Sequence, residues 1–107
     1  MAATTVGVAA GAALNDKALP ETWRGDAAVS YGQTGGRDAL KALNAFVDDG
    51  GNPLALRQAC AGAIGWVAED AAYDAIEARL TDTELPGHAE LVPALVNGLG
   101  ILGARLG

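Results

Sequence analysis

The chain has little of several residue types on which catalysis and cross-linking often depend. Its 107 residues include one cysteine, one methionine, one histidine and few aromatic side chains. A single cysteine excludes an internal disulfide, and Cys60 falls on an apolar stripe where we expect it to act as a small hydrophobic residue. His88 has no nucleophile or carboxylate at a spacing that indicates catalysis.

Positive charge is also scarce. Seven lysine and arginine residues stand against thirteen acidic ones, which gives a net charge of −6 and an isoelectric point near 4.4. The cations are scattered along the sequence, so no basic patch is visible. This balance argues against direct binding of nucleic acid, whose phosphates are held mainly by lysine and arginine.

Long hydrophobic runs are missing as well. No stretch of about twenty apolar residues is present, and residues 91–106 would span only roughly 24 Å of helix, less than the hydrocarbon core of a bilayer. Membrane contact is therefore an alternative that we do not favour. Residues 6–14 are apolar, but no positively charged region precedes them, so we expect no signal peptide and a virion or cytoplasmic location.

Alanine and glycine are abundant, and they occur in patterns typical of helices. Half of the residues are hydrophobic, and alanine, the best helix former, is the commonest of them. We therefore expect an all-α fold in a single domain. Because the apolar side chains are mostly small, the core should be thin and the helices should pack closely.

Two helices are predicted in the middle of the chain. Residues 53–81 carry apolar side chains at steps of three to five, and Asn52 and Pro53 suit the start of a helix. This pattern predicts one long helix, with Gly65 as the point where it would bend or break. Residues 37–49 predict a second helix, with leucine, phenylalanine and valine on its apolar face. A short connection joins the two, so we expect an antiparallel hairpin.

A third helix is predicted at about residues 90–106. Its leucines recur at steps of three and four, and valine and isoleucine broaden the stripe until the segment is apolar nearly all round. Such a helix is either buried or covered by another apolar surface. Gly100 and Ala104, like Gly103 and Gly107, have the small-residue spacing that lets two helices approach closely. We expect this helix in the core or at a contact between subunits.

Residues 1–36 show no sustained period, and we expect them to form an N-terminal arm and an irregular segment. Residues 1–14 carry only small or apolar side chains and threonine, which is compatible with a short helix or with an extended arm on another surface. Residues 15–36 contain a proline and four glycines, a composition typical of a long loop. Trp23 and Tyr31 are the expected anchors of this loop, since aromatic rings bury well.

No pattern in the chain indicates an active site, a cofactor site or a metal site. The turn at residues 48–52 lacks the alternating oxygen ligands of a calcium loop. Asp70, Asp74 and Glu77 share a helical face, but no histidine lies at helical spacing near them, so we interpret the face as solvated. Residues 33–37 precede a helix but lack the lysine and hydroxyl of a phosphate-binding loop. We therefore predict that the protein is not an enzyme.

The sequence favours a structural or assembly protein, a small subunit of a larger particle such as a viral capsid, connector or accessory virion protein. Its partners would be other protein subunits, in a homo- or hetero-oligomer. A helical adaptor that binds another protein is the alternative, and exposed Trp66 and Tyr73 on one helical face would favour it; a membrane-active small protein is less favoured. The side chains predicted to make contacts with partners are Val6, Val8, Trp23, Tyr31, Trp66, Leu95, Leu99 and Leu102.

Overall fold

The computed structural model describes the backbone of residues 2–106 and the side chains of residues 6–106. Within these residues the chain is helical and contains no β-strand, which confirms the predicted all-α fold. In chain order the elements are α1 (Ala2–Leu14), α2 (Glu21–Thr34), α3 (Gly36–Asp48), α4 (Leu54–Ala63), the short 3-10 helix η1 (Ile64–Trp66), α5 (Ala71–Thr81) and α6 (His88–Leu106).

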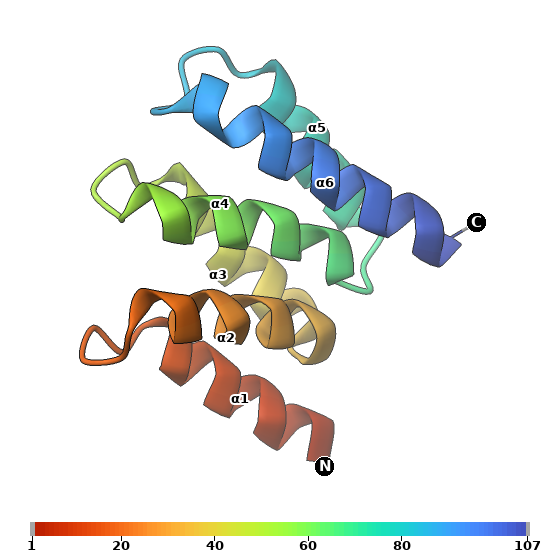
Figure 1. The fold of residues 1–107 in the computed structure, drawn as a ribbon. Helices are drawn as coiled ribbons and strands as arrows, with labels where there is room; N and C mark the ends of the chain where they lie inside the picture. The colour runs from red at the N-terminus through yellow and green to blue at the C-terminus, as the bar shows by residue number, and fades with distance from the viewer. Residues whose placement is uncertain (1, 107) are drawn as a thin grey trace.

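The helices form three pairs, α1 with α2, α3 with α4 and α5 with α6, stacked one on another. Helices α2, α4 and α6 lie side by side in one layer, and α3 and α5 lie behind them (Figure 1). α1 lies beneath α2 at the N-terminal end of the stack. The stack is a slab with extents of 37 × 35 × 18 Å. Stacked helix pairs of this kind are called an α-solenoid.

The turns within the three pairs are built alike. Asp16, Asp49 and Asp82 are equally spaced, and each carboxylate accepts a hydrogen bond from the backbone N–H two residues on, at 2.9, 2.8 and 3.0 Å. Pro20 and Pro53, separated by the same interval, directly precede α2 and α4. The chain therefore contains three copies of an internal repeat of about 33 residues. This repeat length is typical of helical solenoids. The sequence interpretation missed this repeat.

A side chain from the second helix of each pair binds a backbone carbonyl at the end of the first. Nε of buried Arg24 donates to the carbonyl oxygen of Leu14 at 2.8 Å. Nε of buried Arg57, one repeat later, donates to that of Val47 at the same distance. In the third pair the His88 ring takes this place, with Nε2 2.8 Å from the carbonyl oxygen of Leu80. These contacts satisfy helix-end carbonyls that have no partner within their own helix.

The prediction of an irregular N-terminal arm is wrong, because residues 2–14 and 21–34 form two packed helices. The first of them agrees with the short helix that the sequence left open for this segment. α2 begins after Pro20 and its small residues Ala28 and Gly32 are buried. A Cβ atom added at Gly32 would lie 2.5 Å from the carbonyl oxygen of Ala63, so glycine allows α2 to approach α4. Tertiary packing on small residues thus overrides the weak helix propensity of glycine. Trp23 is not a buried anchor, since it is mostly exposed.

The predicted hairpin is present as α3 and α4, but the single helix over residues 53–81 is wrong. α4 ends at Ala63, η1 follows, and the backbone is extended at Val67 before α5 begins. The sequence allowed a bend or break at Gly65, and this residue lies in η1 between the two α-helices. An added Cβ atom there would overlap the carbonyl oxygen of Gly98. The Arg105 guanidinium, from α6, holds the broken segment by donating to the carbonyl of Gly65 at 2.7 Å.

The apolar C-terminal helix is present as α6, which starts at His88, two residues earlier than expected. Leu91 and Leu95 are fully buried, whereas Val96 and Leu106 are exposed, so only one face of α6 lies in the core. Within residues 2–106, α6 is the one helix that is long and apolar enough to cross a membrane by length and composition. Core helices of soluble proteins share this property.

The bonds of Arg57 generate the first prediction. Its guanidinium donates to the carbonyl oxygens of Val47, at 2.6 and 2.8 Å, and of Pro86, at 2.6 Å. Arg57→Ala should lower the free energy of unfolding by about 2–4 kcal/mol, because buried carbonyls lose charge-assisted hydrogen bonds. Urea denaturation measures the change. Arg37→Ala is the matched control, since its side chain is 86% exposed, and it should change stability by less than about 0.5 kcal/mol. Equal effects would contradict this account.

The close approach at Gly65 generates the second prediction. Gly65→Ala should lower the melting temperature, because the new methyl group overlaps the backbone of α6 and overpacking costs about 1–3 kcal/mol. Gly100→Ala should instead raise it, because no atom lies within 4 Å of the added Cβ atom and alanine is the better helix former by about 1 kcal/mol. Calorimetry of both variants checks the opposite signs. A neutral Gly65→Ala would show that the helices are not held this close.

Candidate functional site: the end faces of the stack

The N-terminal end of the stack exposes apolar side chains. Trp23 on α2 is 61% exposed, and Val6 on α1 is 48% exposed. Val8 on α1 is exposed too, and α1 carries no charged residue between Ala2 and Leu14. We call Val6, Val8 and Trp23 the N-terminal end face.

Two of these positions are buried in the following pairs. Trp23 corresponds, one repeat on, to Leu56, which is 1% exposed and lies at the contact of α4 with α2. Val6 corresponds in the same way to Ala39 and Ala72, which are both fully buried. The positions are therefore stacking positions, which a neighbouring helix pair covers elsewhere in this chain. Val8 is different, since its equivalents Lys41 and Asp74 face solvent.

The register of α6 is shifted by one residue relative to α2 and α4. The carbonyls of Pro20 and Pro53 each accept hydrogen bonds from the N–H groups three and four residues on. In α6 the carbonyl of Gly87, and not that of Pro86, accepts the equivalent bonds. Each residue of α6 therefore lies 34 positions after its equivalent in α4, one more than the repeat of 33 residues. This shift decides which residues of α6 face away from the stack.

With this register, the outer face of α6 corresponds to the faces by which α2 and α4 contact the next pair. Val96 corresponds to Gly62, where an added Cβ atom would lie 3.4 Å from the Asn97 side chain of α6. Val92 corresponds to Gln58, whose amide donates to the Glu90 carbonyl of α6 at 3.0 Å. Val96, however, is 52% exposed. The surface that the second pair uses to bind the third is open on the third.

Tyr73 on α5 is another exposed residue whose equivalent in the second pair is buried. It corresponds, one repeat back, to Leu40, which is buried, whereas Tyr73 is about half exposed. Its hydroxyl donates to the Glu77 carboxylate at 3.0 Å, and this bond raises the pKa of Tyr73. We call Tyr73, Val92, Val96 and Leu99 the C-terminal end face.

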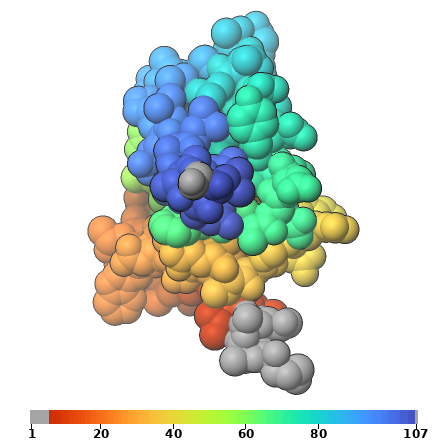
Figure 2. Space-filling model, turned by 90° about the vertical axis from the view of Figure 1, so that its right-hand side faces the viewer, coloured from red at the N-terminus to blue at the C-terminus, as the bar shows by residue number. Residues whose placement is uncertain are grey.

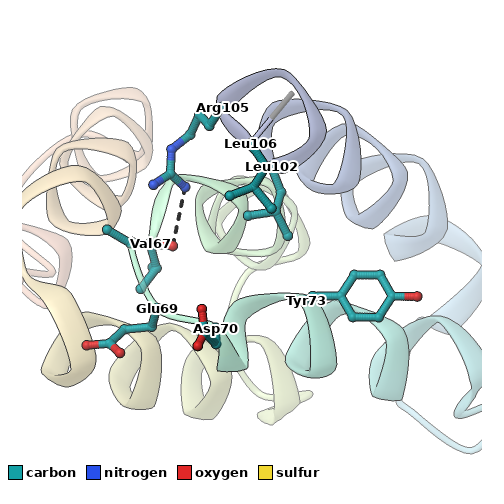
Figure 3. A pocket seen from close by; sticks show the side chains of 8 residues that line it. Val67, Glu69, Asp70, Tyr73, Leu102, Arg105 and Leu106 are labelled. Atoms are coloured by element: carbon teal, nitrogen blue, oxygen red, sulfur yellow. Dashed lines mark hydrogen bonds between the residues drawn. The ribbon is translucent and has the colours of Figure 1, made fainter.

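A cleft of about 340 Å³ opens near the C-terminal end face, between the start of α5 and the end of α6. Leu102 and Leu106 reach into it from α6, and Arg105 bonds the Val67 carbonyl at its wall (Figure 3). The Tyr73 hydroxyl points away from Arg105. In the space-filling view, the end of α6 (dark blue) lies beside the segment that joins α4 to α5 (green) (Figure 2). The cleft is thus an apolar recess with Glu69 and Asp70 at its rim.

A second opening, of about 410 Å³, runs between α2 and α4. Its floor is built of small or apolar residues, among them Gly25, Val29 and Ala59. The carboxylates of Glu21 and Asp26, both exposed, stand at its sides. The groove therefore combines apolar contact with negative charge.

The structure does not bring the eight predicted contact residues together. Val6, Val8 and Trp23 lie exposed at the N-terminal end, whereas Leu95 and Leu102 are buried. The other three of the eight, Tyr31, Trp66 and Leu99, are partly buried. The Tyr31 ring lies against Gly11 and Gly35, and the Cβ atom of Trp66 lies near Gly32. Sequence reasoning did not single out Val92 or Val96. Alignment of the repeats alone would not have identified this face, because the one-residue shift of α6 is seen only in the hydrogen bonds of the Gly87 carbonyl.

The reactive groups of the chain have structural surroundings. Cys60 is fully buried, and burial raises the pKa of its thiol to about 12, so it stays protonated and unreactive at neutral pH. Asp48 forms an ion pair with Arg79 at 2.7 Å. In the part of the chain that the structure describes, no three histidine, cysteine or acidic residues lie close enough to hold a metal ion. The end faces and the groove are thus the features that remain as candidate sites.

Comparison of the chain with protein-family models, with curated proteins and with solved structures finds no match.

Proposed function

We propose that the protein is a non-enzymatic assembly protein, a short α-solenoid that joins other protein subunits through its N-terminal end face. The observation that carries this proposal is the contrast between Trp23 and Leu56. Both occupy the same position of the repeat, yet Leu56 is covered by the preceding pair and Trp23 is 61% exposed. Covering an aromatic side chain of this size would contribute roughly 1.5–3 kcal/mol to binding.

The composition of α1 supports the same proposal. The end repeats of solenoids that work as monomers carry a polar outer face, which keeps the exposed end soluble. α1 has no charged residue over its thirteen positions, and Val6, Val8, Ala9 and Ala12 are exposed on it. An uncharged helix at an exposed end is what a contact between subunits would require.

The route to assembly differs from the one the sequence suggested. Residues 2–34 do not extend as a free arm towards a neighbour, because α1 and α2 pack on each other and on the next pair. The proposed contact is therefore a rigid helical face. We keep as a proposal the setting of a larger particle, such as a viral capsid, connector or accessory virion protein, in which one subunit meets several neighbours.

A helical adaptor is the second candidate, and the groove between α2 and α4 favours it. Its apolar floor and the carboxylates of Glu21 and Asp26 would suit a peptide or helix that carries an apolar side chain beside lysine or arginine. The pair of aromatic residues expected to support an adaptor does not form one face. Trp66 lies in η1 and is partly buried, whereas Tyr73 lies on α5.

Site-specific photo-crosslinking tests the assembly proposal. A benzophenone amino acid placed at Trp23 should crosslink to a protein subunit in the cells that produce the chain, because the N-terminal end face is covered there. The same group at Leu54 is the matched control, since Leu54 is an exposed apolar residue of the middle pair. It should give little or no crosslinked product.

The crosslinked protein is identified by mass spectrometry. Absence of any crosslinked protein from position 23 would contradict the assembly proposal. Efficient crosslinking from Val29, which lines the groove, with none from position 23 would favour the adaptor instead.

A further inference from the structure

We propose that the subunit covering the N-terminal end face is a second copy of this chain, which binds through its C-terminal end face. This inference rests on the proposed assembly function and names its partner. The juxtaposition that carries it lies within one chain: the second helix pair presents one face to the first pair and the opposite face to the third. Within residues 6–106, no further helix pair covers the outer side of the first pair or of the third.

The internal contact between α4 and α6 shows what the contact between copies would use. Gln58 and Gly62 on α4 and Gly65 on η1 face α6. Their equivalents on α6, with the one-residue shift included, are Val92, Val96 and Leu99. The third pair thus carries larger apolar side chains at the positions that contact a following pair. Large apolar residues at an open stacking face indicate that the face is covered in the working protein.

The N-terminal end face offers the complementary half. On α4, Leu56 packs into the contact with α2, beside Gly25 and Val29. Trp23 is the equivalent residue of the first pair. In a stack of two copies it would lie beside Val92 and Val96 of the second copy, as Leu56 lies beside Gly25 and Val29. Bulky and apolar residues would then meet on both sides of the contact.

The outer face of α6 has room for a second copy beyond Val96. Gly103 lies on the same side of α6 as Val96, about two helical turns further on, and no atom lies within 4 Å of a Cβ atom added there. α6 continues to Leu106, well beyond the equivalent end of α4 at Ala63. The last helix therefore extends its outer face past the end of the helix that it covers.

The size of the end faces sets the strength of the contact. With extents of 37 × 35 × 18 Å, one end of the slab has an area of the order of 600 Å², against about 800 Å² per partner in a standard interface. We therefore expect association that depends on concentration, with Kd in the range of about 1–100 µM. A face that binds a different face leaves each growing stack with one free end of each kind, so association would not stop at a dimer.

Mixing two blocked variants tests the inference. Trp23→Glu blocks the N-terminal end face and Val96→Glu blocks the C-terminal end face. Both side chains are more than half exposed, so the variants should fold as the unaltered chain does, which circular dichroism checks. Each substitution should weaken self-association at least about tenfold, because a carboxylate would lose its water at the contact. Leu54→Glu, on the middle pair, should leave association unchanged.

The expected pattern is seen by sedimentation velocity. The mass of the unaltered chain should rise with concentration beyond that of a dimer, and each blocked variant should be monomeric. An equimolar mixture of the two should form a dimer and nothing larger. The C-terminal end face of the Trp23→Glu variant can bind the N-terminal end face of the Val96→Glu variant, and the two remaining faces are blocked.

Three outcomes would overturn the inference: an unaltered chain that stays monomeric at about 1 mM, a mixture of variants that stays monomeric, or a Val96→Glu variant that still dimerises. The last would show that two N-terminal end faces bind each other. If position 23 crosslinks to a different protein while the chain is monomeric, the inference fails and the assembly function stands. If position 23 crosslinks to nothing, both fail.

Discussion

Neighbouring helix pairs come so close in the α2–α4–α6 stack that only glycine fits at two of the contacts. At Gly32 a Cβ atom would lie 2.5 Å from the Ala63 carbonyl oxygen, and at Gly65 it would overlap that of Gly98. Glycine at these positions is therefore what permits the stack, since each pair covers its neighbour with backbone and small side chains. Larger apolar side chains, such as Trp23 and Val96, stand exposed at the two ends. The proposed function follows from this contrast between small residues inside the stack and larger apolar residues at its two ends.

A helix could be predicted from the sequence where it buries large apolar side chains, and not where it buries small ones. α3 and α6 were found because leucine, valine and phenylalanine recur along them with the helical period. α2 was missed because its buried residues are Arg24, Ala28 and Gly32, a set that gives no hydrophobic period. Its burial comes from close packing against α4, which is long-range information. The sequence indicates a bend or break near Gly65, but the contacts of this segment with Gly98 and Arg105 of α6 are long-range and are not visible in the sequence.

The candidate site was less accessible from the sequence than the fold. The leucine stripe of α6 indicated an interacting face, but Leu95 and Leu102 are buried in the core of the same chain. The outward face carries Val96, and it could be identified only through the one-residue shift at Gly87. The shift arises because the first hydrogen bonds of α6 are accepted by the carbonyl of Gly87, and not by that of Pro86. A search for repeats, through Asp16, Asp49 and Asp82, would have recovered the stacking positions but not this register.

The central claim is that Trp23 occupies a stacking position that a neighbouring subunit covers. The most direct measurement is the fluorescence of Trp23 as protein concentration rises, in a Trp66→Phe background so that one tryptophan reports. At low concentration its emission should be that of a largely exposed indole, in keeping with its 61% exposure. We predict a shift to shorter wavelength as copies stack and the ring loses water. Emission that stays constant from about 1 µM to 1 mM, around the Kd expected for a contact of this size, would contradict it.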